Sequence, residues 1–294
     1  MASSRKYRLL AGIAVMVSAA GAAVALTRPA LAVTGIVVVQ SDGATPRSQE
    51  GGRFTTAFCP QGMHVLGGGA DIIGGSQTVH LQRVVPFLGT PGQPDGVTAD
   101  AFEDNRGTDH DWTMRTTAVC APASALPGWA FVFGPIVASG PGGQDVSAHV
   151  DCPAGTKVIG AGGQAAGFHY LLDDVMPDSD LSGVTAEVMR DDSNQPDTGG
   201  SAQASAICAD PLPGLQLVTR KTAASTGNKT VSAPCPSGTR VIGAAGALSG
   251  ALGQAHLDRI GFNSSRSRSD VDARADVDGT SNRWQAWAFA ICAR

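Results

Sequence analysis

Adjacent aspartates are the residues of this sequence whose type and spacing best suit chemistry. Two such pairs occur, Asp173-Asp174 and Asp191-Asp192, and exposed carboxylate oxygens are the ligands that Ca²⁺ prefers. The sequence holds no Asp-x-Asp-x-Asp-Gly stretch, which is typical of a dedicated calcium loop. We therefore predict no obligatory cofactor or metal. The one alternative is a calcium site, built either from Asp173, Asp174, Asp178 and Asp180 or from Asp191 and Asp192.

Tryptophans are the second set of residues that could bind a ligand. Trp112 and Trp284 each lie eight residues before a cysteine, and Trp287 follows shortly after Trp284. A buried indole would pack beside that cysteine, whereas an exposed indole could stack on a sugar ring. Both interpretations stay open, and the candidate ligand-binding residues are Trp112, Trp284 and Trp287.

The sequence lacks the signatures of common catalytic sites. A serine hydrolase would carry Gly-x-Ser-x-Gly before a helix, and the nearest stretches, 199–203 and 246–250, miss that spacing. The six histidines include no pair at the i, i+4 spacing that binds zinc on a helix. These observations favour a non-catalytic protein, and they leave open a hydrolase that uses carboxylates where two sequence repeats meet.

The candidate residues lie in a unit that occurs three times. Each copy opens with Cys-Pro-x-Gly-x-x-Val-x-Gly and ends with Ala-[Val/Ile]-Cys-Ala. Self-similarity at a period of about 87 residues indicates three homologous units, although a chain of 294 residues would ordinarily be divided into two domains. The predicted units are residues 33–122, 123–210 and 211–294.

The repeat also bears on how the cysteines pair. Six cysteines allow 15 pairings, but each unit holds one cysteine in each of its two motifs, and a repeated fold should repeat its bridge. A metal site would instead need Cys-x-x-Cys or clustered histidines, and the sequence has neither. The predicted disulfides are Cys59–Cys120, Cys152–Cys208 and Cys235–Cys292.

Alternation of apolar and polar residues predicts six strands in each unit. In the first unit these strands fall near residues 35–40, 53–59, 64–71, 79–85, 97–103 and 112–120. The third contains Gly67-Gly68-Gly69, which indicates a bulge or a close approach of backbones, such as three units meeting near a common axis. Copies of the fifth are predicted to begin at Val97, Val184 and Val271. The equivalent residues that end it, predicted to cap turns, are Asp104, Asp191 and Asp278.

The paired motifs resemble a module of secreted proteins from high-GC Gram-positive bacteria, for which no activity is established. The Cys-Pro-x-Gly opening is also similar, more weakly, to the vitelline membrane outer layer protein I family, a threefold β-prism. That family has shorter repeats, and Leu257-Asp-Arg-Ile260 matches its Leu-Asn-Gly-Ile motif only loosely. The alternation predicts an all-β fold of three tandem antiparallel units, and the short connectors between them favour a compact body. The resemblance implies that the three units take a pseudo-threefold, β-prism-like arrangement. Three separate β-sandwich-like beads are the alternative.

The first 32 residues predict export. Arg5, Lys6 and Arg8 precede an apolar run over residues 9–26, and a small-x-small motif ends at Ala32. Cleavage there would leave 17 basic and 25 acidic residues, a formal charge of −8, and no further membrane-spanning run. The mature protein is therefore predicted to be secreted, with no attraction for nucleic acid and no membrane span.

Composition narrows the class of protein without specifying its function. A charged content of 16% together with 38 glycines excludes a disordered chain and a coiled coil. We predict a secreted, non-catalytic repeat protein that binds an extracellular or cell-envelope ligand, for example a glycan. The alternatives are a secreted hydrolase and a structural extracellular protein. The sequence identifies neither the ligand nor the oligomeric state.

Overall fold

Alternating apolar and polar residues form antiparallel β-strands in all three repeats. In β5 (Gly96–Glu103), Val97, Ala99 and Ala101 are buried, whereas the side chains between them are partly exposed. No helix in the described part of the chain is long and apolar enough to cross a membrane. The predicted signal sequence lies outside the described residues except for Ala32. The structure, a computed structural model, describes residues 32–43, 52–75, 77–90, 92–104, 106–140, 145–167, 169–191 and 199–294.

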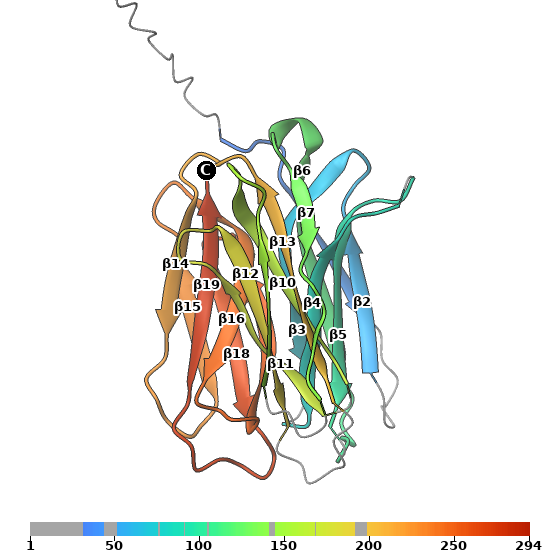
Figure 1. Cartoon of the computed structure of the whole chain (residues 1–294), viewed down its shortest axis with the longest axis vertical. Coiled ribbons are helices and arrows are strands. Elements are labelled where there is room, and N and C mark those ends of the chain that lie inside the picture. The colour runs from blue at the N-terminus through green and yellow to red at the C-terminus, as the bar shows by residue number, and fades with distance from the viewer. Residues whose placement is uncertain are drawn as a thin grey trace, which may run out of the picture. The chain divides into compact units, whose positions relative to one another are not determined.

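The strands form four antiparallel sheets, whose arrows run mainly along the vertical of Figure 1. Sheet A contains, in order, β1 (Val37–Gly43), β6 (Thr113–Pro122), β3 (Met63–Ile73), β17 (Ala255–Phe262), β18 (Arg268–Ala275) and β15 (Lys229–Pro234). Sheet B contains β2 (Gly52–Phe58), β5, β4 (Val79–Phe87), β10 (Lys157–Ala166), β13 (Ser201–Ala209) and β7 (Ala130–Phe133), with β8 (Val137–Ala138) also paired to β13. Sheet C contains β11 (Tyr170–Pro177), β12 (Gly183–Arg190) and β9 (Asp145–Asp151). Sheet D contains β14 (Gln216–Lys221), β19 (Gln285–Ala293) and β16 (Arg240–Ser249), and a single 3-10 turn, η1 (Ala123–Ala125), follows β6.

Sheets A and B each combine strands from two repeats. In sheet A, Ile260 on β17 pairs with Ala70 on β3, and in sheet B, Val84 on β4 pairs with Gly163 on β10. Sheets C and D come from the second and third repeats, and β11 of sheet C contacts β16 of sheet D. Residues 31–294 form one compact unit, so the alternative of three separate beads is wrong.

Glycines of the third strands meet where the three repeats come together. A Cβ built on Gly67 would lie 2.9 Å from the Cα of Gly243 and 3.4 Å from the Cα of Gly160. A Cβ on Gly160 would lie 2.1 Å from the carbonyl oxygen of Leu66. Each of these strands also has a bulge just before its glycine. The glycine run therefore permits the close backbone approach that the sequence indicates, at a point where third strands of all three repeats meet.

The fifth strand of the third repeat corrects the predicted alignment by two residues. The residue after β5 is Asp104, whose N–H donates to Thr78, and the corresponding bond in the third repeat joins Asp276 to Gln254. Asp276 is thus the equivalent of Asp104, and Asp278 is not. A shift of two residues keeps each side chain on the same face of the sheet, which is why the alternation alone does not reveal it.

The disulfides pair as the repeat predicts, and each joins two different sheets. Cys59 follows β2 in sheet B and bonds Cys120 on β6 in sheet A. The second bridge joins sheets C and B, and the third joins sheets A and D. Each disulfide therefore links the two sheets to which the strands of its repeat belong.

Candidate functional site

The two tryptophans that precede closing cysteines are buried. Trp112 is 2% exposed and Trp284 is 0% exposed. The indole N–H of Trp112 donates to Glu103 Oε1 at 2.8 Å, and that of Trp284 donates to the carbonyl of Thr226 at 3.3 Å. Neither ring presents a face to solvent, so neither indole can stack on a sugar ring, and both are core side chains. The prediction that each packs beside its cysteine is wrong, because eight residues of extended strand place each tryptophan about 26 Å from that cysteine.

The second repeat fills the corresponding space with a tyrosine. Gly200 occupies the position of the two tryptophans, and a Cβ built on it would lie 2.4 Å from the ring of Tyr170. Tyr170 is 0% exposed, and its hydroxyl lies 3.1 Å from Ser139 Oγ. The absence of a tryptophan in this repeat is therefore explained by packing, without any loss of a binding site.

Trp287 lies on β19, where its side chain is half-buried. The Nζ of Lys221 stands 4.6 Å from the centre of its ring, and the ring is parallel to that of Phe289 with 6.4 Å between centroids. Its cross-strand partner on β14 is Lys221, in sheet D. The structure does not place Trp287 in a common site with Trp112, and a ligand-binding role for it stays a prediction.

The aspartates of the calcium prediction do not form a common site in the described part of the chain, and Asp178 instead lies near His149 and Asp151. Asp173 and Asp174 lie on β11 and are 4% and 5% exposed. Asp174 pairs across to Glu187 on β12, whereas Asp191 follows the far end of that strand, where Tyr170 is the partner of Arg190. Asp192 lies outside the described residues. What the structure brings together is one buried pair of carboxyl groups.

Another group of side chains that could hold a metal ion was not foreseen from the sequence. His149 Nε2 lies 3.2 Å from Asp151 Oδ1 and 3.9 Å from Asp178 Oδ2, and ligand atoms of all three lie within 4.8 Å of one another. The second nitrogen of His149 lies 3.0 Å from Thr185 Oγ1. Side chains of Asp151 and His149 are 78% and 42% exposed, and acidic groups this exposed are common without a metal. We assign no metal site to them.

One histidine has part of the geometry of a catalytic triad. His64 Nδ1 lies 2.7 Å from Asp95 Oδ2, and the imidazole stacks on Trp129 with 4.0 Å between ring centres. None of the hydrogen bonds described for His64 involves a serine, threonine or cysteine. The pair supplies a base and its orienting carboxylate without a nucleophile, so it supports no acyl-transfer chemistry.

Sheet A carries a groove in the described part of the chain. It has a volume of about 310 Å³ and lies where the first repeat meets the third. β1 and β6 line one side, β3 forms the floor, and β17 with the turn after it lines the other side. The lining residues are Val38, Gln40, Gly69, Ala70, Asp71, Arg115, Thr117, Arg259, Gly261, Phe262, Asn263 and Ser264.

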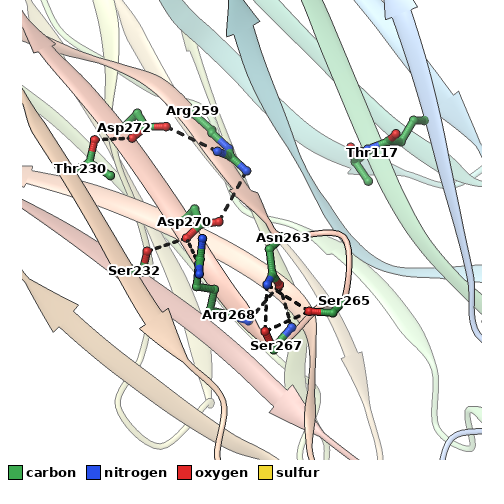
Figure 2. Close-up of polar contacts among 11 residues, drawn as sticks. Thr117, Thr230, Ser232, Arg259, Asn263, Ser265, Ser267, Arg268, Asp270 and Asp272 are labelled. Atoms are coloured by element: carbon green, nitrogen blue, oxygen red, sulfur yellow. Dashed lines mark hydrogen bonds and ion pairs between the residues drawn. The ribbon is translucent and has the colours of Figure 1, made fainter.

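Arg259 is held in this groove by two aspartates of the neighbouring strand (Figure 2). Its guanidinium nitrogens lie 3.6 Å from Asp270 Oδ2 and 3.6 Å from Asp272 Oδ2. Asp270 also accepts hydrogen bonds from Ser232 Oγ at 2.6 Å and Arg268 Nε at 2.7 Å. Because both Arg259 contacts are longer than a direct hydrogen bond, the guanidinium is oriented by charge and keeps donors for a ligand.

The rim of the groove beyond β17 is a turn organised by Asn263. Its Oδ1 accepts from the backbone N–H of Ser267 at 2.8 Å and that of Arg268 at 3.3 Å. Its Nδ2 donates to Ser265 Oγ at 3.1 Å and Ser267 Oγ at 2.9 Å, which Figure 2 shows as one cluster. The amide is thus used internally, and it fixes the rim so that Ser264 and Phe262 keep their places beside the groove.

Asp71 lies at the floor of the groove as the cross-strand partner of Arg259. Burial raises the pKa of its carboxyl, and the positive charges of Arg259 and Arg115 oppose that rise. Arg115 in turn donates to Asp42 Oδ1 at 2.6 Å. Positive and negative groups therefore alternate across the site. The charged groups of the groove and its immediate partners are Asp42, Asp71, Asp270, Asp272, Arg115, Arg259 and Arg268.

A missing side chain keeps this groove open. Gly261 pairs with Asp270, and the residues at the corresponding position of the other two repeats are Val85, which pairs with Thr98, and Met176. A Cβ built on Gly261 would lie 3.4 Å from Arg259 Nε, so any larger side chain would enter the groove. The groove is consequently a property of this one junction, even though the strands around it recur.

Comparisons with known proteins give no family for the chain. No protein-family model matches it. No curated protein matches it significantly. A functional conclusion therefore depends on the geometry and charge of the groove.

None of the groove residues was identified from the sequence. The signal that could have found them is the position after the Leu-x-x-[Val/Ile] motif, where two repeats have Val85 and Met176 and the third has Gly261. A glycine at one of three equivalent strand positions marks a place where something else can approach the backbone. The partner strands β1 and β6 come from a different repeat, so the sequence alone could not place Arg115 opposite Arg259.

Proposed function

We propose that this chain is an exported, non-catalytic protein whose groove on sheet A binds a neutral polyhydroxylated ligand, such as one or two sugar residues of an extracellular or envelope glycan. A volume of about 310 Å³ suits a ligand of that size. Export is supported by the three disulfides, because such bonds persist in oxidising compartments.

The observation that carries this proposal is the position of Asp71 between Arg115 and Arg259. A sugar hydroxyl both donates and accepts, so neighbouring hydroxyls can donate to a carboxylate and accept from a guanidinium. The groove and its partners hold four aspartates against three arginines, which disfavours an anionic ligand.

A hydrolase is the alternative that one observation favours. Asp71 lies at a junction between repeats, and burial raises the pKa of its carboxyl, as a general acid requires. Glycosidases use two carboxyl groups about 5–10 Å apart on either side of the bond. Asp71 is the one carboxylate among the described residues that line the groove, so binding is the better-supported function. Release of new reducing ends from a bound glycan would decide for the hydrolase.

Gly261→Val is expected to weaken binding of the ligand while leaving the fold intact. The valine copies Val85 of the first repeat, and its side chain would occupy the groove and displace Arg259. The mature protein should bind at least one neutral glycan on an array, and the variant should bind that glycan about tenfold more weakly or worse, a loss of about 1.4 kcal/mol. Isothermal titration with the best array ligand measures both affinities.

Met176→Val is the matched control, because it introduces the same side chain at the equivalent position of the second repeat, outside the groove. Its affinity should equal that of the unmodified protein. Equal affinity of the Gly261→Val variant would place the ligand elsewhere, and an array with no bound neutral glycan would remove the glycan proposal itself.

A further inference from the structure

The junction between the second and third repeats differs from the other two in how its strands meet. Sheets A and B cross their repeat junctions by backbone pairing, whereas sheets C and D are not joined by such a ladder. At the paired junctions a glycine faces the neighbouring strand, and a Cβ on Gly69 would lie 2.1 Å from the carbonyl oxygen of Ile260. The same position in the third repeat is Ala245, whose methyl group keeps β16 away from β11.

A carboxyl group bridges the gap. Asp174 Oδ1 on β11 accepts a hydrogen bond of 2.7 Å from the backbone N–H of Leu248 on β16. Both partners are buried, Asp174 being 5% and Leu248 4% exposed. A side chain from sheet C therefore takes the place of a backbone carbonyl in contacting the edge of sheet D.

The partner of Asp174 is a second acid where the other repeats have an ion pair. Glu187 on β12 is the cross-strand neighbour of Asp174. Two carboxyl groups held side by side, one of them buried, repel each other strongly when both are ionised, so the ionised form of the buried one is disfavoured. The residues at the equivalent positions are oppositely charged, with 2.7 Å between Arg83 and Asp100 and 3.6 Å between Arg259 and Asp272.

In the described part of the chain, no arginine is paired with Asp174 or Glu187, whereas Arg83 and Arg259 pair with aspartates at the equivalent positions of the other two repeats. Asp173, the neighbouring residue, is 4% exposed and leaves its Oδ1 without a hydrogen-bond partner. The charges that act most strongly on Asp173 are those of Asp174, Glu187 and Asp145, all acidic. The polar groups that surround Asp173 and Asp174 are thus Asp145 from β9, Glu187 from β12 and the backbone N–H of Leu248 from β16. None of the strongest charges comes from β4, β10 or β17, which also pack on β11.

We propose that Asp174 keeps its proton beside Glu187, and that the protonated Asp174 is a pH-dependent clasp that joins sheet C to sheet D. Loss of this proton leaves a buried carboxylate between buried Asp173 and half-buried Glu187, and the repulsion among these groups loosens the contact with Leu248. The clasp is a conformational device of the fold, and it does not depend on what the groove on sheet A binds.

The direction of the pH effect follows from the buried carboxyl. Burial raises the pKa of Asp174 from its ordinary 3.8 to about 8, and burial with the charge of Asp174 raises the pKa of Asp173 as well. A carboxyl whose pKa is higher in the folded than in the unfolded chain stabilises the fold fully below its unfolded pKa. That stabilisation is lost as the pH rises from about 4 to about 8. Acid therefore closes the clasp and alkali opens it.

The test compares the mature protein with its Asp174→Asn variant between pH 5 and pH 9 in buffer containing a chelator. The asparagine can still accept from Leu248 and donate to Glu187, but it cannot titrate. Thermal unfolding should show the midpoint of the unmodified protein falling by about 5 °C or more over this range, and that of the variant falling by less than half as much. If the unfolding midpoint fell by the same amount in the unmodified protein and in Asp174→Asn, the proposal would be overturned.

Hydrogen exchange at the Leu248 amide reports on the clasp itself. Its protection, measured relative to the sheet A amide of Ile260, should decrease as the pH rises in the unmodified protein and stay constant in the variant. Asp276→Asn is the matched control, because burial also raises the pKa of Asp276 but its N–H bonds Gln254, away from the clasp.

If Asp174→Asn fails to fold, Glu187→Gln tests the same pair of residues by changing its half-buried member. Calcium that raises the midpoint of the unmodified protein at pH 8, but not that of Asp174→Asn, would show a cation site and overturn the proposal that Asp174 is protonated.

Discussion

Gly160→Ala is expected to lower the free energy of unfolding by about 3 kcal/mol or more, or to prevent folding altogether. A Cβ at this position would lie 2.1 Å from the carbonyl oxygen of Leu66 and 2.9 Å from the Cα of Gly67. Both obstructing atoms belong to backbone, so no side chain can rotate away to make room. Relief would require the second repeat to move away from the first at the point where all three meet. Urea denaturation of the oxidised protein measures the loss.

The close approach of the three glycines makes a graded prediction as well. The closest backbone atom to an added Cβ is 2.6 Å away at Gly243 and 2.8 Å away at Gly67, so the loss should decrease from Gly160 to Gly243 to Gly67. Gly227→Ala is the control, because nothing lies within 4 Å of an added Cβ there. A Gly160→Ala variant as stable as the control would contradict the close approach of the three backbones.

Internal repetition is what made this fold predictable. Three copies of one pattern made the six strands, the disulfide pairing and the special third strand visible, because any feature needed by the fold had to occur three times. Gly67 and Gly160 illustrate the point, since one glycine run could be a flexible loop but three in register indicate a packing requirement. The packing of Trp112 and its absence at Gly200 likewise became intelligible once Tyr170 was seen to fill the gap.

Features that belong to one copy, or to the contact between copies, could not be predicted in this way. The alternation of β18 fits the sequence equally well in two registers, so the equivalence of Asp276 with Asp104 needed the backbone hydrogen bonds. The exchange of strands between repeats is set by tertiary packing, which local patterns do not encode. The groove and the clasp both arise at such contacts, through Gly261 in one case and Asp174 in the other.

Removing both cysteines of one bridge by alanine is expected to lower the free energy of unfolding by about 4 kcal/mol. The sequence separations of 61, 56 and 57 residues are nearly equal, so the loop-entropy contributions should agree to about 0.1 kcal/mol. Equilibrium urea unfolding of the three double variants measures the losses, and non-reducing peptide mapping confirms that the two remaining bridges are native. The unmodified protein under reducing conditions gives the combined effect.

The three double variants should nevertheless differ, because their bridges hold different sheets. Cys59–Cys120 joins sheets A and B, each of which also spans two repeats by backbone pairing. Cys235–Cys292 joins sheet A to sheet D, whose other neighbour, sheet C, is reached through the Asp174 clasp without a ladder. Loss of the Cys235–Cys292 bridge should therefore cost more than loss of Cys59–Cys120, and the excess should grow between pH 6 and pH 9 as the clasp opens. If the two variants lost the same free energy of unfolding at every pH, loop entropy alone would set the contribution of each bridge. The contact between sheets C and D would then be as stable as the two junctions that are joined by backbone pairing.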